Sequence, residues 1–211
     1  MSDLHAHLSG FVAAYSILLV AASSPGPAVA LLLGIANGQG RKAALITTLG
    51  ITVGSMTINL LTLVGVGLLL SQAAWAMSLL RLAGAAYLLY LAWGAFRRAA
   101  RPPAVSSADS PRAGPLRLFA EGYLLQVTNP KAIAFWLAIA AIGATEGGSA
   151  GVVVAFVAGA AVISFACHAF WALALSAAPV RRAYAAGRRW VEAGLGVFLA
   201  FAAFKLATSQ R

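Results

Sequence analysis

Long apolar runs alternate with short polar or basic segments along the whole chain. A transmembrane helix needs about 20 predominantly apolar residues to cross the hydrocarbon core. Runs of about this length or longer occur at 11–36, 43–70, 74–96, 118–143, 149–177 and 190–208. The pattern therefore predicts an all-α polytopic membrane protein with six transmembrane helices.

The basic residues predict the orientation of these helices. Eleven of the 15 Lys and Arg residues fall in the segments after the first, third and fifth runs. Cytoplasmic loops of membrane proteins carry such an excess. We therefore expect these three loops in the cytoplasm and both chain termini outside.

A polar, Pro- and Ser-rich segment divides the chain into two parts. Residues 101–117 read as a flexible cytoplasmic linker between a first three-helix repeat, 1–100, and a second, 118–211. An odd number of helices in each part makes the second enter the membrane from the opposite side. The parts are therefore expected to be inverted repeats, a common plan for transporters.

Composition narrows the classes of function. Charged residues make up 9% of the chain and the net charge is +10. The basic residues lie in short clusters between apolar runs, which indicates contact with lipid headgroups rather than nucleic acid. The single cysteine, Cys167, forms no internal disulfide and builds no cysteine metal site. No cofactor is expected.

Two clusters of helix-breaking residues lie near the middle of their runs. The first is Ser24-Pro25-Gly26-Pro27 and the second is Asn129-Pro130-Lys131. Asn129 is a good N-cap and Pro130 suits the first helical position, and Ser24 with Pro25 repeats that pair. We expect both sites to be N-termini of half-helices, whose free N–H groups and positive dipole end attract a carboxylate.

Lys131 is the residue of greatest interest. A charge near the centre of a bilayer costs roughly 2.5–3.5 kcal/mol on insertion scales. A cation at a helix N-terminus also opposes the helix dipole. We interpret Lys131 as a partner for a substrate carboxylate. The alternative is a structural lysine that snorkels, or that pairs with Glu121 or with a carbonyl group.

Other polar residues are secondary candidates. Gln126 lies one turn before Pro130, and Asn59 lies within the second run. Either could line a substrate cavity, although Asn59 could equally bond a neighbouring helix. His168 follows Ser164 by one turn and could relay protons or be a packed neutral histidine. Glu121 and Glu192 are expected to pair with basic residues at the cytoplasmic membrane interface.

At these residues the sequence resembles the LysE/RhtB family of amino-acid exporters. The features that match are the two breaker clusters, the turn Gly38-Gln39-Gly40-Arg41-Lys42-Ala43, and further residues in the second, third and fourth runs (Gly50, Gly54, Gly84, Tyr87-Leu88, Gly122 and Ala132). The resemblance covers nearly the whole chain and implies a bacterial inner-membrane exporter driven by proton motive force. It leaves the substrate open.

We therefore expect a transporter and not an enzyme. The substrate-binding residues would be Pro25, Gly26, Pro27, Asn129, Pro130, Lys131, Gln126 and Asn59, with His168 as a proton relay. No acidic residue is expected at mid-span, which favours a neutral amino acid. Export of a divalent metal or another small metabolite is the alternative, but no metal site is expected because none of the five acids lies at mid-span. Self-association is left open.

Overall fold

The computed structural model describes residues 5–72, 74–101 and 113–208. The helices are α2 (Leu8–Ser23), α3 (Pro27–Gly38), α4 (Gly40–Gln72), α5 (Ala74–Ala100), α6 (Pro115–Val127), α7 (Pro130–Ala140), α8 (Ala150–Ala174) and α9 (Ala178–Thr208). The described part of the chain is all-helical, as the hydrophobic pattern predicts. Most of the predicted linker, residues 102–112, lies outside the described residues.

Two of the predicted helices are interrupted at their breaker clusters. Helices α2 and α3 meet at an angle of 45° across Ser24–Gly26. Helices α6 and α7 are separated by Thr128 and Asn129. Proline lacks a backbone donor and clashes with the carbonyl four residues earlier, which explains both interruptions.

Asn129 and Pro130 begin α7 as predicted, but the corresponding prediction for Ser24 and Pro25 is wrong. The Asn129 side chain caps α7, and Pro130 is its first residue. Ser24 instead ends α2, and α3 begins two residues later than expected, at Pro27 with Gly26 as its N-cap. The extended backbone of Gly26 (φ −177°, ψ −168°) carries the chain across the bend.

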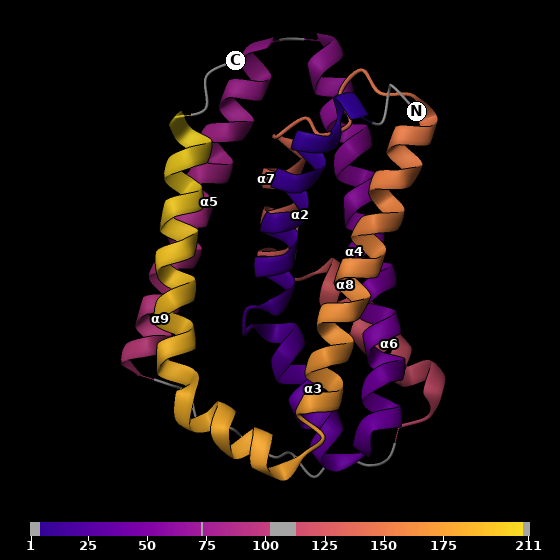
Figure 1. The fold of residues 1–211 in the computed structure, drawn as a ribbon, viewed down its shortest axis with the longest axis vertical. Helices are drawn as coiled ribbons and strands as arrows, with labels where there is room; N and C mark the ends of the chain where they lie inside the picture. The colour runs from indigo at the N-terminus through magenta and orange to yellow at the C-terminus, as the bar shows by residue number, and fades with distance from the viewer. Residues whose placement is uncertain (1–4, 73, 102–112, 209–211) are drawn as a thin grey trace.

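Helices from the two predicted repeats pack against each other. Helix α5 packs along α9, and α4 packs against α8. Helix α4 also contacts α6 and α7, while α8 contacts α2 and α3. In Figure 1 the interrupted helices α2/α3 and α7 lie between the α5–α9 pair and the α4–α8 pair. The breaks are therefore placed in the interior of the molecule.

Small residues allow the closest approach, between α4 and α6. A Cβ atom added to Gly122 would lie 2.2 Å from the carbonyl oxygen of Thr47, and one added to Gly50 would lie 2.0 Å from that of Phe119. These distances leave no room for any side chain. The contact fixes α6, and with it the break that follows, against the first half of α4.

Length and apolarity identify fewer membrane spans than the six expected. Among the described residues, Gly40–Gly65 in α4 and Ala150–Ala174 in α8 are long and apolar enough to cross a membrane. The bent pair α2/α3 gives a third if it counts as one span. Helix α7, with 11 residues, is apolar but too short to cross alone.

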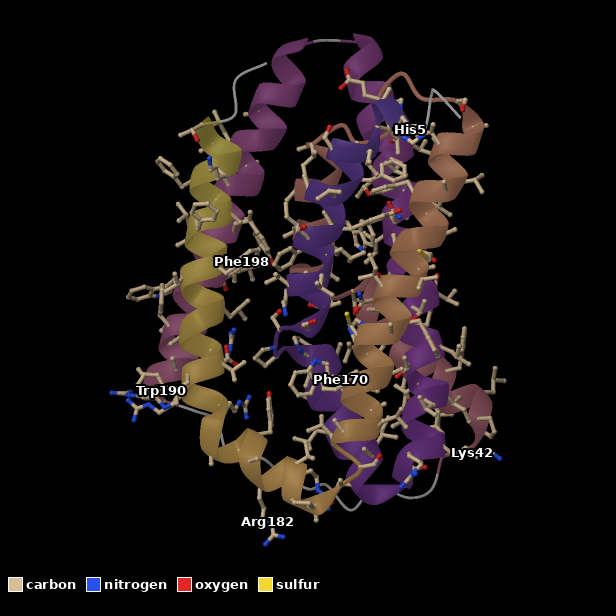
Figure 2. All side chains as sticks on the ribbon, viewed as in Figure 1. His5, Lys42, Phe170, Arg182, Trp190 and Phe198 are labelled. Carbon is tan, nitrogen blue, oxygen red and sulfur yellow. The ribbon has the colours of Figure 1, made fainter. Side chains whose placement is uncertain are left out.

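Several basic residues assigned to loops are helical. Arg181, Arg182, Arg188 and Arg189 belong to the first turns of α9, which starts well before the predicted 190–208. Lys42 and Arg182 lie at one end of the molecule (Figure 2), and the start of α2 and the end of α9 lie at the other (Figure 1).

Candidate functional site

The two helix breaks meet at the side chain of Lys131. Its ammonium group donates hydrogen bonds to the Ser24 carbonyl at 3.2 Å, to the Pro25 carbonyl at 3.4 Å and to the Ser24 hydroxyl. It also lies 6.0 Å from the centre of the Phe135 ring. A residue from the second half of the chain thus contacts the break in the first half. Of the partners considered for Lys131 in the sequence, backbone carbonyl groups are the ones that it bonds.

Lys131 and Gly26 are in close contact. A Cβ atom added to Gly26 would lie 3.1 Å from the Lys131 nitrogen and 3.3 Å from its Cδ atom. A side chain at position 26 would therefore require the end of Lys131 to shift by a few tenths of an ångström. The present placement of the ammonium group thus depends on the small residue at position 26.

The half-helices α3 and α7 differ at their N-termini. The Asn129 Oδ1 atom accepts a hydrogen bond of 3.0 Å from the Lys131 backbone N–H, which caps α7. Helix α3 has no side-chain cap. The backbone N–H groups of Ala28 and Val29 have no partner among the described residues. The start of α3 therefore leaves two N–H groups free to bind an anion.

The carbonyl groups that the prolines release are already hydrogen-bonded. The Ser24 hydroxyl donates to the Ala21 carbonyl at 2.8 Å, and the Trp171 indole N–H donates to the Ser23 carbonyl at 3.2 Å. The Asn129 N–H donates to the Gln126 carbonyl at 3.2 Å. These partners stabilise the two breaks in a region where unpaired backbone groups would be expensive.

A cavity of about 40 Å³ lies between the two breaks. A water molecule needs at least roughly 10–15 Å³ of such space, so the cavity has room for a few waters. Its lining includes the predicted site residues Gly26, Pro27, Gln126, Asn129, Lys131 and His168. Pro25, Pro130 and Asn59 are not among the lining residues.

The cavity has polar side chains with unused hydrogen-bonding atoms. Gln126 Oε1 and Ser164 Oγ are buried and have no partner among the described residues. Asn59, which is 1% exposed, uses neither its amide nitrogen nor its amide oxygen. It lies one helical turn beyond Ser55, which does line the cavity. Unsatisfied buried atoms of this kind commonly mark a bound water, ion or ligand.

The cavity is also lined by four residues outside the predicted substrate-binding set: Ser55, Trp136, Ser164 and Phe135. The Trp136 indole N–H donates to the Ser55 hydroxyl at 3.0 Å, which joins α7 to α4. The available signal was helical spacing: Ser55 precedes Asn59 by one turn, and Ser164 precedes His168 by one turn. The aromatic residues gave no comparable signal.

His168 is buried in α8 and faces the cavity. Its Nδ1 atom lies 2.8 Å from the Ser164 carbonyl oxygen, so this ring nitrogen is the protonated one in the neutral tautomer. The other ring nitrogen is left as an acceptor.

Glu192 pairs with a basic residue as expected, but its carboxylate is buried. It is 1% exposed and accepts hydrogen bonds of 3.1 Å at both oxygens from the Arg98 Nε–H. The pair joins α9 to α5 in the interior. Glu121, in contrast, pairs with Arg117 one turn away on the surface of α6, at 2.9 Å.

An all-helical chain with long apolar helices, two interrupted helices and a polar cavity at their breaks defines a membrane transport protein as the class. Comparison with known proteins agrees. Residues 19–210 match the model of the LysE type translocator family, and the chain belongs to that family.

Three relatives illustrate the similarity. The chain is 28% identical to the uncharacterized membrane protein YahN of Escherichia coli K12, over 87% of this chain and 82% of the relative. It is 33% identical to the threonine efflux protein of the same organism, over 60% and 62%. It is 31% identical to the homoserine/homoserine lactone efflux protein of Salmonella typhimurium, over 55% of each chain.

The match spans less than two thirds of the length of these two efflux proteins. No solved structure matches the chain.

Proposed function

We propose that this protein exports neutral amino acids from the bacterial cytoplasm and that proton motive force drives the export. The observation that carries the proposal is the Lys131 ammonium held between two interrupted helices beside a polar cavity. Family membership and the names of the threonine and homoserine efflux relatives support an amino-acid substrate.

The substrate carboxylate binds between Lys131 and the uncapped start of α3. The N–H groups of Ala28 and Val29 are available there, and the helix dipole favours a negative charge. In the absence of substrate, Lys131 bonds the Ser24 and Pro25 carbonyls. A carboxylate competes for the lysine because charge-assisted hydrogen bonds are stronger than those to neutral carbonyls.

The breaker residues and the polar cavity residues have separate roles. Pro25, Gly26, Pro27 and Pro130 keep the two helices interrupted. Gln126 and Ser164 offer unused oxygen atoms to polar groups of the substrate.

Asn59 binds water on the same face of α4. His168 is the relay for the coupling proton, because its second ring nitrogen can accept one at the cavity.

Transport occurs by alternating access between two inverted three-helix repeats in the inner membrane, with six spans and both termini outside. The packing supports this plan. In such repeats α4 corresponds to α8, and α2/α3 corresponds to α6/α7. The contacts of α4 with α6 and α7 therefore correspond to those of α8 with α2 and α3, and both sets are present. The basic residues Lys42 and Arg182 share the end that is then cytoplasmic (Figure 2).

The direct test is efflux from proteoliposomes loaded with a mixture of the twenty common amino acids, with and without an imposed pH gradient. We expect selective loss of one or a few neutral amino acids, accelerated by the gradient. Loss of no amino acid from correctly folded protein would contradict the proposal. Efflux that ignores the gradient would remove proton coupling and leave amino-acid export standing.

A further inference from the structure

Glu192 is an acidic residue in an unusual place. Ionisable residues within membrane helices are costly and usually mark substrate or ion pathways. Glu192 is 1% exposed, whereas the Arg98 side chain that holds it is 40% exposed. Among the acids whose side chains the structure describes, Glu121 and Glu146 are far more accessible. The burial of Glu192 therefore calls for an explanation beyond a surface ion pair.

The helix registers place Glu192 at the depth of Lys131. Phe135 on α7 and Leu195 on α9 belong to one buried cluster, together with Ala95 on α5. Lys131 lies one turn before Phe135, and Glu192 lies one turn before Leu195. Helices α7 and α9 run in the same direction (Figure 1), so both charged residues lie on the same side of this cluster.

Arg98 reaches the same level from the opposite direction. Helix α5 runs antiparallel to α9 (Figure 1), and Arg98 follows Ala95 by about one turn. The three charges therefore lie beside the same buried cluster, where the Glu192 carboxylate attracts the Lys131 ammonium and the Arg98 guanidinium repels it. Phe135 lines the cavity and also packs against α5 and α9, so it separates the cavity from the ion pair.

We propose that Glu192 binds the α-ammonium group of the substrate and that Arg98 occupies this carboxylate when no substrate is bound. This inference rests on the proposed amino-acid export. A neutral amino acid is a zwitterion, and Lys131 with the start of α3 accounts only for its carboxylate. Glu192 supplies the opposite charge on the far side of Phe135.

The geometry of the ion pair is suited to such an exchange. Arg98 contacts Glu192 through a single nitrogen, Nε, which is shared between both oxygens. A carboxylate has about four lone-pair sites, so acceptor capacity remains for an ammonium group. Arg98 is partly exposed and lies two residues before the end of α5, so its long side chain can release Glu192 and extend toward that end of the helix. Movement of Phe135 would join the carboxylate to the cavity.

The test compares amino acids with analogues that lack only the ammonium group. Proteoliposomes are loaded with alanine, valine and threonine, or with the matched 2-hydroxy acids, such as lactate for alanine. The wild type should export the amino acids well and the 2-hydroxy acids poorly. Glu192→Gln should lower amino-acid efflux roughly 10- to 100-fold, the equivalent of one charge-assisted hydrogen bond. It should also raise the ratio of hydroxy-acid to amino-acid efflux.

The double variant Arg98→Gln/Glu192→Gln separates binding from a structural role, because it replaces the ion pair with two neutral amides. It also serves if Glu192→Gln alone folds poorly with Arg98 unpaired. If Glu192 binds substrate, the double variant stays as defective as Glu192→Gln. Recovery to the wild-type rate, or wild-type efflux by Glu192→Gln, would overturn the inference.

Glu121→Gln, which removes an exposed ion pair, is the matched control and should export normally. Wild-type protein that exports none of the three amino acids, nor any other from the mixture of twenty, would refute the proposed function itself.

Discussion

Replacement of Lys131 by methionine tests the centre of the proposed site. Methionine keeps the length and apolar stem of lysine and removes the charge. The loss leaves the Ser24 and Pro25 carbonyls without their present donor, at about 1–3 kcal/mol each. The substitution also removes the cost of placing a charge within the membrane, which is roughly 2.5–3.5 kcal/mol. These effects largely offset each other, so the folded state should survive.

Transport should be far more sensitive than stability. The substrate carboxylate loses a charge-assisted hydrogen bond worth roughly 1.5–3 kcal/mol, which corresponds to a 10- to 100-fold decrease in efflux. The assay is proteoliposome efflux, with thermal unfolding in detergent to verify folding. Lys42→Met, at an exposed lysine near one end of the molecule (Figure 2), is the matched control. Wild-type efflux by folded Lys131→Met would refute the assignment of the site.

Three further substitutions test the architecture around the cavity. Gly122→Val should destabilise the protein by several kcal/mol because even its Cβ atom would meet the Thr47 carbonyl at 2.2 Å. Gly187→Val is the control, because a Cβ atom added there meets nothing within 4 Å. Equal unfolding temperatures for the two variants would contradict the packing of α4 against α6. Asn129→Ala should cost about 1 kcal/mol through loss of the α7 cap, and Asn129→Ser should recover most of it in thermal unfolding. Trp171→Phe should lower the unfolding temperature, because it leaves the Ser23 carbonyl unpaired at a cost of about 1–3 kcal/mol. An unchanged unfolding temperature would show that the indole does not stabilise the break through this hydrogen bond.

The local rules for helix starts explain why one break was predicted correctly and the other was not. Asn129 and Pro130 form a cap and a first residue with no competing signal nearby. The first cluster contains two prolines, and either could occupy the first helical position. Pro27 prevails, and Ser24 bonds back to Ala21 in the helix that precedes it. Residue preferences at helix starts locate a break within a few residues, but they do not show which of two nearby prolines begins the helix.

The burial of Glu192 illustrates a second limit of sequence reasoning. The preceding arginines at 181–189 made it resemble an interfacial acid beside a basic loop. That segment is the start of α9, and Glu192 belongs to the face of this helix that also carries the buried Leu195 and Leu199. Its partner Arg98 is 94 residues away in the chain. A contact over such a separation depends on tertiary packing, which periodicity alone does not reveal.

The unequal N-termini of α3 and α7 show what the structure adds to the two breaker motifs. From sequence, both clusters were equivalent candidates for a carboxylate site. In the fold, the Asn129 side chain occupies the first N–H group of α7, whereas Gly26 contributes no side chain to α3. In the proposed site, the start of α3 therefore binds the anion, and the motif of α7 contributes the cation, Lys131. The two motifs are complementary halves of that site, and Gly26→Ala, whose Cβ atom would lie 3.1 Å from the Lys131 nitrogen, should lower proteoliposome efflux less than Lys131→Met does.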